Sequence, residues 1–158
     1  KTALWAGATD KRFAMVVSNN SGCTGAALSR RKVGERFNIL IRIRPYWYAP
    51  NFSKYNDKEE HLVVDQHQLI ALMAPRPVYV ASADKDLYAD PEGEFLSLYY
   101  ASEVYKLFNL KGLVDMQMPK VNSPVFSGQA GYHLRHGNHD ITVYDWSQFL
   151  KFAGLHLK

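Results

Sequence analysis

The sequence predicts an α/β fold with three layers, in which helices cover both faces of a mostly parallel sheet. Short apolar runs, typical of buried strands, alternate along the chain with longer segments whose apolar residues recur at helical spacing. Hydrophobic residues make up 47% of the 158 residues and charged residues 22%, which is the composition of a globular protein. No internal repeat, low-complexity run or linker divides the chain, so we expect one structural unit.

The first half of the chain predicts one helix, one strand and a long excursion. Residues 1–8 have helical character, and residues 12–17 form an apolar run that ends at the polar Ser18, as a buried strand does. The excursion covers residues 21–57, which are rich in glycine at first and then helical around residues 28–43.

The second half of the chain repeats this alternation with clearer boundaries. Residues 65–73 predict a helix that ends before two prolines, and residues 78–82 predict a second buried strand. Residues 94–108 carry apolar and aromatic side chains at helical spacing, and residues 129–135 predict a third strand. Residues 142–157 predict a closing amphipathic helix.

The closing helix has the most specific local signals. Thr142 and Asp145 have the spacing of a capping box, in which each side chain bonds the backbone of the other residue. The residues expected to share one apolar face are Val143, Trp146, Phe149, Leu150, Ala153 and Leu157.

Two loops that follow predicted strands carry groups suited to catalysis. Asp86 follows strand 78–82, and His139 follows strand 129–135. Functional groups of parallel sheets collect at the carboxyl ends of the strands. A carboxylate that accepts a hydrogen bond from one imidazole nitrogen fixes the tautomer, so that the other nitrogen can deprotonate a hydroxyl. An acid after one late strand and a histidine after the next is the order of an α/β-hydrolase triad.

The serine expected of such a triad is not found in the sequence. It normally lies in a G-x-S-x-G motif, on a sharp turn between a strand and a helix. No serine of this chain has that context. Residues 1–8 have the character of the interior of an element, so we expect that the chain is truncated and that the serine turn lies just upstream.

Five segments of the chain resemble the glucuronoyl esterases of carbohydrate esterase family 15. The sequence KTALWAGA (residues 1–8) resembles the helix that follows the nucleophile turn, and SNNSGCTGAALSRR (18–31) resembles the next loop of bacterial members. The segments DQHQLIALMAPRPVYVASA (65–83), DLYADP (86–91) and GNHD (137–140) resemble later parts of the same family, in the same order.

The resemblance implies a fold and an activity. Residues 1–158 would be the C-terminal part of a single α/β-hydrolase catalytic domain, without its nucleophilic serine. The enzyme would be a serine carboxylesterase that cleaves uronate esters between glucuronoxylan and lignin, without a cofactor. By the same resemblance it would be secreted or periplasmic and monomeric at full length, and the chain alone would be inactive.

The resemblance also implies roles for individual residues. His139 would be the general base and Asp86 the acid that orients it. The residues that would bind the substrate are Lys1, Glu35 and Tyr88. Some family members place a Glu after the preceding strand, where this chain has Asn20. Because an amide carries no negative charge, this difference favours Asp86 as the acid.

Each assignment has an alternative. His136 is the rival of His139, and Asp86 is of a residue type that is common in turns. Glu35 could pair with a neighbouring arginine on a helix surface. His67 lies in an apolar helix and is expected to be a hydrogen-bonded core residue. The irregular spacing of the nearby acidic and histidine side chains argues against a metal site there.

Charge and hydropathy limit the partners. The net charge is +4, and the excess lies largely in one basic cluster: Arg30, Arg31, Lys32, Arg36, Arg42 and Arg44. Such a cluster is either a solvated face or a surface for an anionic ligand. No nucleic-acid-binding motif accompanies it and no apolar stretch reaches about 18 residues, so we expect neither nucleic acid nor a membrane as a partner. Cys23 is the only cysteine, so no disulfide can form within the chain.

Two other functions remain open from the sequence. One is a carbohydrate-binding pseudoenzyme, in which aromatic and basic side chains hold a sugar without chemistry. The other is an esterase for a different substrate, such as a xylan deacetylase, which would not need a cation to read the uronate.

Overall fold

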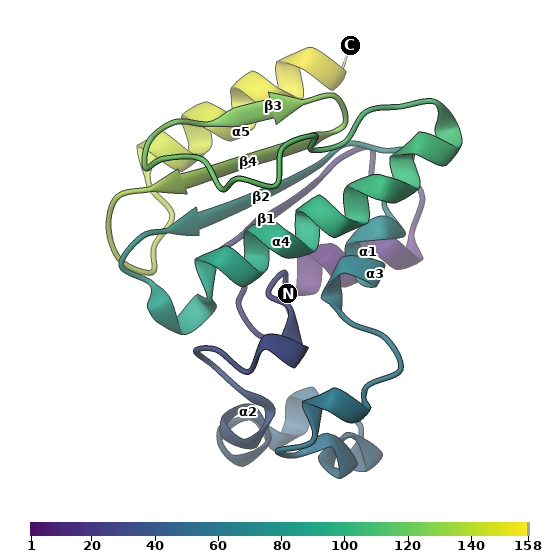
Figure 1. Ribbon diagram of the computed structural model, residues 1–158, viewed down its shortest axis with the longest axis vertical. Helices are drawn as coiled ribbons and strands as arrows, with labels where there is room; N and C mark the ends of the chain where they lie inside the picture. The colour runs from purple at the N-terminus through teal and green to yellow at the C-terminus, as the bar shows by residue number, and fades with distance from the viewer. Residues whose placement is uncertain (158) are drawn as a thin grey trace.

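A four-stranded sheet lies at the centre of the structure, a computed structural model that describes residues 1–157. The strand order is β1-β2-β4-β3, in which β1 (Val16–Asn19), β2 (Val78–Ala83) and β4 (Ala130–Arg135) are parallel. At one edge β3 (Val125–Ser127) pairs antiparallel with β4 (Figure 1). The mostly parallel sheet predicted from the sequence is confirmed.

Helices cover both faces of the sheet, as predicted. On one face lie α1 (Thr2–Thr9), α3 (Gln66–Ala71) and α4 (Pro91–Ala101), and on the other lies α5 (Val143–His156). Figure 1 shows α4 and α5 on opposite sides of the strands. These are the three layers of an α/β fold. Among residues 1–157, the helices are too short or too polar to cross a membrane.

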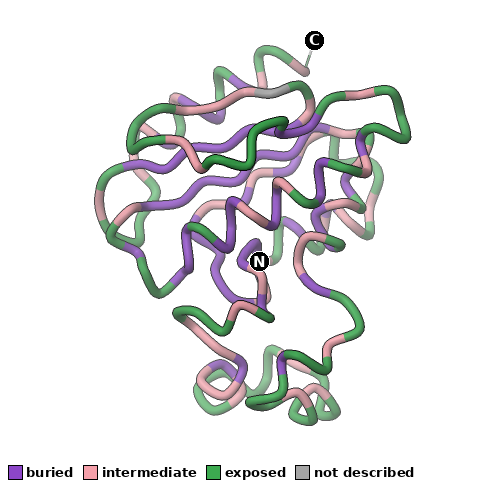
Figure 2. The backbone as a smooth tube through the Cα atoms, viewed as in Figure 1, coloured by how far each residue is buried: buried purple, intermediate pink, exposed green. Residues whose placement is uncertain are grey.

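The core follows from the alternation of side chains along the central strand. All six residues of β2 are buried, because helices cover the strand on both faces (Figure 2). Val78 and Val80 join the larger apolar cluster, under α4, whereas Tyr79 and Ala81 join the smaller one, against α5. Burial of each large apolar side chain contributes roughly 1.5–3 kcal/mol. The strand that leads into the Asp86 loop is therefore firmly held.

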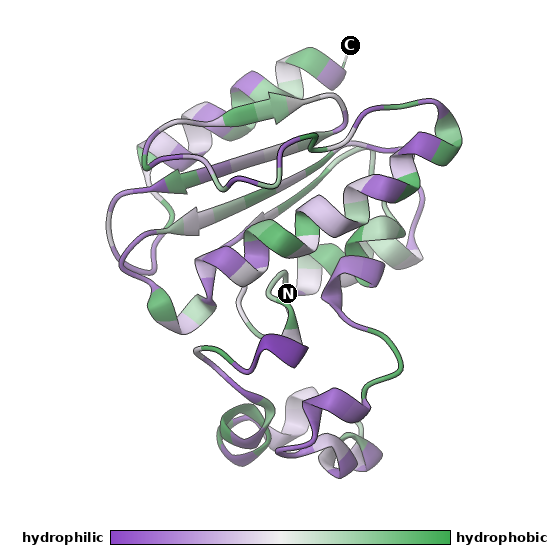
Figure 3. Cartoon of the chain, viewed as in Figure 1, coloured by the Kyte–Doolittle hydropathy of each residue, from purple (hydrophilic) through white to green (hydrophobic). Residues whose placement is uncertain are grey.

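The closing helix begins where the capping pattern predicts. Asp145 accepts a hydrogen bond from the backbone N–H of Thr142 at 2.6 Å, and Thr142 Oγ1 accepts one from the backbone N–H of Asp145 at 3.5 Å. The apolar face, however, was predicted too broadly. Phe149 and Phe152 are buried, whereas four residues expected beside Phe149 are exposed: Val143, Trp146, Leu150 and Leu157. Hydrophobic and hydrophilic residues alternate along α5 in Figure 3.

Residues 28–43 do not form the continuous helix that was predicted. A 3-10 turn, Ser29–Arg31, is followed by the short α2 (Phe37–Ile43), and Gly34 lies between them. Gly34 has a φ of +64°, and a Cβ there would lie 2.3 Å from the carbonyl oxygen of Tyr88. This close approach to the loop after β2 requires glycine and breaks the helix.

Residues 36–62, which include α2, form a small lobe that projects from the sheet in Figure 1. Three 3-10 helices complete the lobe: Pro45–Trp47, Pro50–Tyr55 and Glu59–His61. Its aromatic rings pack on one another, and the ring of Phe52 lies 4.7 Å, between centroids, from both Phe37 and Tyr48. The lobe thus has its own apolar cluster, separate from the core on either face of the sheet.

Other element boundaries differ from the prediction by a few residues. β1 begins at Val16, later than predicted, because the preceding residues turn around the Arg76 side chain, which donates to their carbonyl oxygens. The helix expected at residues 94–108 begins at Pro91 and changes to a 3-10 helix at Ser102. The short β3 was not predicted, since three residues carry no readable periodicity.

Candidate functional site

A pocket of about 220 Å³ lies between the ends of β1 and β2 and the lobe. Its lining includes all five residues to which the sequence assigned a role: Lys1, Glu35, Asp86, Tyr88 and His139. These residues are far apart in the sequence. The last three come together because the carboxyl ends of parallel strands meet at the same edge of a sheet. Side chains of the lobe, among them Arg44 and Trp47, form the opposite wall.

Asp86 and His139 form a hydrogen-bonded pair in this pocket. Nδ1 of His139 lies 2.7 Å from Oδ2 of Asp86. The two residues follow β2 and β4, which are neighbours in the sheet, so their loops lie side by side. The side chain of Asp86 is 7% exposed and that of His139 is 72% exposed. The carboxylate is therefore shielded, and Nε2 is the ring nitrogen available to take a proton from a hydroxyl.

The rival histidine is paired elsewhere. Nδ1 of His136 lies 2.9 Å from Oδ2 of Asp84, and neither residue lines the pocket. Oδ1 of Asp84 accepts a hydrogen bond from the backbone N–H of Gly137 at 2.8 Å. This bond, together with the one from His136, lowers the pKa of Asp84. His136 therefore joins the loops that follow β2 and β4, and His139 is the histidine that lines the pocket.

Asn20 supports the loop of His139 through the backbone. Its Nδ2 donates to the carbonyl oxygen of Asp140 at 3.3 Å, directly after His139. Oδ1 of Asn20 is buried and has no hydrogen-bond partner among residues 1–157. A neutral amide in this position cannot stabilise an imidazolium by charge.

Lys1 and Glu35 place opposite charges side by side in the pocket. Nζ of Lys1 donates to Oε2 of Glu35 at 3.1 Å and to the carbonyl oxygen of Ser21 at 2.7 Å. The alternative that Glu35 pairs with a neighbouring arginine is wrong, since Arg36 pairs with Glu59 at 2.9 Å. The pocket therefore offers both a donor and an acceptor to a polar ligand.

Two aromatic rings lie at the wall of the pocket. Tyr88 is half-exposed, and burial together with the charge of Glu35 raises the pKa of its hydroxyl, which therefore stays a neutral donor. Trp47 received no role from the sequence. Its ring centroid lies 6.0 Å from Nζ of Lys1 and 5.8 Å from Cζ of Arg44. The signal that could have identified it is the aromatic run at residues 46–48 in an otherwise basic segment.

A buried glutamate supports the floor of the pocket and was missed from the sequence. Oε1 of Glu94 accepts hydrogen bonds from the backbone N–H groups of Ser21 and Gly22 at 2.7 and 3.0 Å, and Oε2 accepts one from the Ser82 hydroxyl at 2.6 Å. Glu94 is fully buried. Burial raises its pKa to about 7, against the hydrogen bonds, which favour the ionised form. Glu94 therefore fixes the loop whose Ser21 carbonyl binds Lys1.

This raised pKa predicts a pH-dependent stability. Between about 4.5 and about 7 the folded protein keeps the Glu94 proton that the unfolded chain has released, so stability falls as the pH rises through this window. A shift of this size corresponds to about 3 kcal/mol. We expect Glu94→Gln to remove this slope, because an amide does not titrate. Denaturant unfolding of both proteins at pH 4.5 and 8 measures the difference, and parallel pH curves would contradict the prediction.

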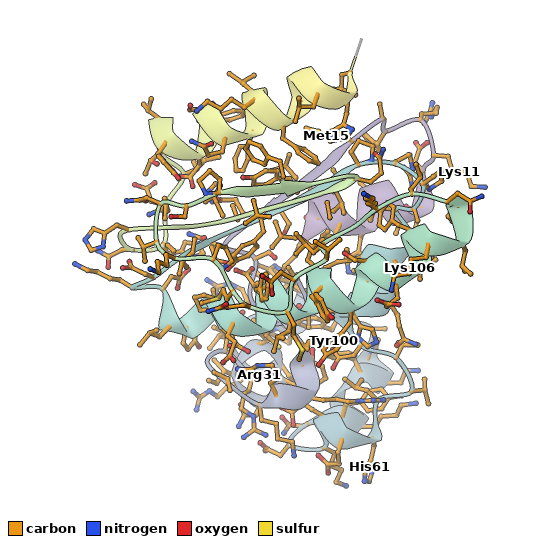
Figure 4. All side chains as sticks on the ribbon, turned by 45° about the horizontal axis from the view of Figure 1, so that its top comes forward. Lys11, Met15, Arg31, His61, Tyr100 and Lys106 are labelled. Atoms are coloured by element: carbon orange, nitrogen blue, oxygen red, sulfur yellow. The ribbon has the colours of Figure 1, made fainter. Side chains whose placement is uncertain are left out.

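Three of the six residues of the basic cluster pair with carboxylates of the chain itself. Arg31, labelled in Figure 4, pairs with Asp90 at 2.9 Å and with Glu92 at 2.7 Å. Lys32 and Arg36 pair with glutamates of the lobe. For these three residues the contacts favour an ion-paired face, on which an exposed pair such as Lys32 with Glu60 contributes about 0–1 kcal/mol.

His67 does not fit its prediction. It was expected to be hydrogen-bonded in the core, but its ring is only partly buried and lies 6.1 Å, between centroids, from the ring of Tyr100. Its buried Nδ1 has no hydrogen-bond partner within the described part of the chain. Burial lowers the pKa of this imidazole. Within residues 1–157, the His, Cys, Asp and Glu side chains form no group of three that could hold a metal.

Comparison with known proteins places this chain in a family. A family model described as "Glucuronyl esterase, fungi" matches residues 1–109. A carbohydrate esterase from an unknown prokaryotic organism is 50% identical over 157 residues, which are 99% of this chain and 36% of that protein. A 4-O-methyl-glucuronoyl methylesterase from Podospora anserina is 32% identical over 87 residues, 51% of this chain and 18% of that enzyme.

The solved structures agree with the sequence comparisons. The structure of a glucuronoyl esterase from Solibacter usitatus is 49% identical and matches with a TM-score of 0.93, over 99% of this chain and 40% of that one. The chain therefore spans well under half the length of these relatives. With the family model matched over more than half of its residues, and with an α/β-hydrolase architecture shared with the solved structures, this chain belongs to the glucuronoyl esterase family.

Proposed function

We propose that this chain supplies the acid–base pair and substrate-binding groups of a serine carboxylesterase that cleaves 4-O-methyl-glucuronoyl esters. The observation that carries the proposal is the hydrogen bond between His139 and Asp86 in a pocket that also holds Lys1 and Glu35. A histidine and an acid on successive loops of this sheet match two members of an α/β-hydrolase triad. Family membership and the names of the relatives support the substrate class.

In the proposed mechanism, His139 moves the protons of two acyl-transfer steps. A serine hydroxyl attacks the ester carbonyl of the uronate while Nε2 of His139 takes the hydroxyl proton. Asp86 holds the productive tautomer and stabilises the imidazolium, which then protonates the leaving alcohol. Water, deprotonated by His139, hydrolyses the acyl-enzyme. In this proposal the serine, and an arginine beside it that binds the oxyanion, come from the part of the enzyme upstream of Lys1, as the family resemblance implies.

Lys1, Glu35 and Tyr88 bind the sugar in this proposal. The Glu35 carboxylate can accept hydrogen bonds from sugar hydroxyls, and the Lys1 ammonium can donate to a substrate oxygen. The ring of Tyr88 offers a flat apolar face to the sugar. We further propose that the natural substrate is glucuronoxylan esterified to lignin, and that the full-length enzyme is a secreted or periplasmic monomer.

The test uses a full-length chimera, in which the upstream part of the 50%-identical carbohydrate esterase precedes residues 1–158. We expect this chimera to hydrolyse a benzyl ester of glucuronate much faster than it deacetylates acetylated xylan, because only the first substrate presents a uronate to Lys1 and Glu35. The measurement is kcat/KM on both substrates. Faster deacetylation of xylan would reject the proposed substrate class.

A matched pair of variants tests the sugar-binding role in the same chimera. We expect Glu35→Gln to raise KM for the benzyl ester about tenfold, since it removes a charge-assisted acceptor, and to leave kcat nearly unchanged. Glu60→Gln is the control, because Glu60 also pairs with a lysine but lies on the lobe surface outside the pocket. Equal KM values for the two variants would remove Glu35 from the substrate site.

A further inference from the structure

One buried guanidinium holds the backbone of the loop that carries His139. Arg135 is the last residue of β4, and its Nη2 donates to the carbonyl oxygens of Asn138 and Asp140 at 2.8 and 2.7 Å. Its Nη1 donates to the carbonyl oxygen of His136 at 3.3 Å. The two shortest bonds thus reach the residues immediately before and after His139.

Asp145, in the first turn of α5, holds this guanidinium through its Nε, while the other two nitrogens bond the loop. Nε of Arg135 donates to both carboxylate oxygens of Asp145, at 2.9 and 3.1 Å. Arg135 is 3% exposed and Asp145 is fully buried. Burial opposes ionisation of Asp145, but hydrogen bonds from Thr142 and His133 and the charge of Arg135 hold the pKa of that carboxyl below its usual value. The pair is therefore charged, and the hydrogen bonds from Thr142 and His133 fix the position of its carboxylate.

A gain in folding stability alone does not explain why these two charges are buried together. Removing two charges from water is costly, and apolar replacements of buried ion pairs are often neutral or stabilising.

The loop is also fitted closely to the guanidinium. Gly137 has a φ of +120°, and a Cβ there would lie 3.0 Å from Nη1 of Arg135. A planar group with five N–H donors can bond a carboxylate and several carbonyls at once, which a lysine cannot do in the same geometry.

We propose that Arg135, held by Asp145, is a positioning residue for His139. It fixes the backbone on both sides of the histidine, so that Nδ1 stays on Asp86 and Nε2 stays aimed at the reacting hydroxyl. Arg135 does not line the pocket, so it acts through the loop and not on the substrate. The inference rests on the proposed function, in which His139 is the general base.

Arg135→Lys in the full-length chimera tests this role. We expect kcat on the benzyl glucuronate ester to fall about 100-fold, because a displacement of about 1 Å in a catalytic group has an effect of that size. KM should stay within about twofold, since the sugar-binding side chains are not attached to this loop. In proton NMR, the downfield signal of the hydrogen between His139 and Asp86 should broaden or disappear.

Arg76→Lys is the matched control. The guanidinium of Arg76 also donates to several backbone carbonyl oxygens, including those of Gly7 at 2.7 Å and Phe13 at 2.9 Å. It lies before β2, at the end of the sheet away from the pocket. We expect this variant to lower Tm as Arg135→Lys does, but to keep kcat and the NMR signal.

The outcomes separate positioning from a purely structural role. A lower Tm with unchanged kcat and unchanged NMR signal in Arg135→Lys would overturn the proposal. If that variant does not fold, Asp145→Asn replaces it, because an amide keeps an acceptor for Nε of Arg135 but removes the charge that holds the guanidinium. There a loss of kcat and of the NMR signal beyond that of Arg76→Lys supports the proposal, and an unchanged kcat and signal overturn it.

The NMR measurement also separates this inference from the proposed function. The hydrogen between His139 and Asp86 can be observed in a protein without esterase activity. If the chimera hydrolyses no uronate ester, but the signal is present and is lost in Arg135→Lys, the proposed function fails and the positioning role stands.

Discussion

In the full-length chimera, Asp86→Asn is expected to lower kcat for glucuronate esters about 10⁴-fold and to leave the fold intact. The carboxylate lies 2.7 Å from Nδ1 of His139 and is 7% exposed, so it acts on the imidazole with little screening by water. An amide in its place can hydrogen-bond the ring but cannot stabilise the imidazolium, and it can favour the wrong tautomer. The measurement is kcat, with circular dichroism and Tm to verify the fold.

Asp84→Asn is the matched control for this variant. Asp84 belongs to the same loop and also pairs with a histidine, His136, but this pair lies outside the pocket. We expect the kcat of Asp84→Asn to stay within about tenfold of the wild type. We expect the same of Asn20→Ala, which removes only a 3.3 Å hydrogen bond to a backbone carbonyl. A larger loss in Asn20→Ala or Asp84→Asn than in Asp86→Asn would show that the acid is wrongly assigned.

The meeting of Asp86 and His139 was predictable because it depends on topology. Two strands with apolar runs were readable from the sequence, and the parallel order of their carboxyl ends brings the following loops together. The contact of Lys1 with Glu35 was not predictable from spacing, because it depends on how the lobe folds back on the pocket. The family resemblance alone suggested that both residues belong to one site.

The contacts of the buried polar residues Arg135, Asp145 and Glu94 could not be predicted from sequence patterns. Asp145 was recognised as part of a capping box, which is a local pattern, but its contact with Arg135 depends on the packing of α5 against β4. Glu94 was expected only as the start of a helix, because nothing in its neighbourhood shows that it meets the loop after β1. The break at Gly34 has the same origin, since it is caused by the distant carbonyl of Tyr88.

The 158-residue chain by itself is expected to show no turnover of glucuronate esters, and this expectation follows from the serines that the structure describes. Ser21 is the serine that lines the pocket, yet its residue is 6% exposed. Its Oγ lies 2.7 Å from that of Ser18, accepts a hydrogen bond from the backbone N–H of Ala26 at 2.7 Å, and lies 3.2 Å from Oε1 of Glu94. A hydroxyl held by these three groups is not free to attack an ester.

The size of the effect makes the experiment decisive. Removing a catalytic triad costs about 10⁶-fold in kcat, and removing an oxyanion-hole donor costs a further ~10²–10³-fold. The purified chain should therefore release benzyl alcohol from benzyl glucuronate no faster than buffer, while the full-length chimera hydrolyses the ester. His139→Ala in the chimera should abolish this activity, because the proton of the attacking hydroxyl then has no acceptor. Turnover by the isolated chain that disappears in Ser21→Ala would instead make Ser21 the nucleophile, and the serine implied upstream of Lys1 would not be needed.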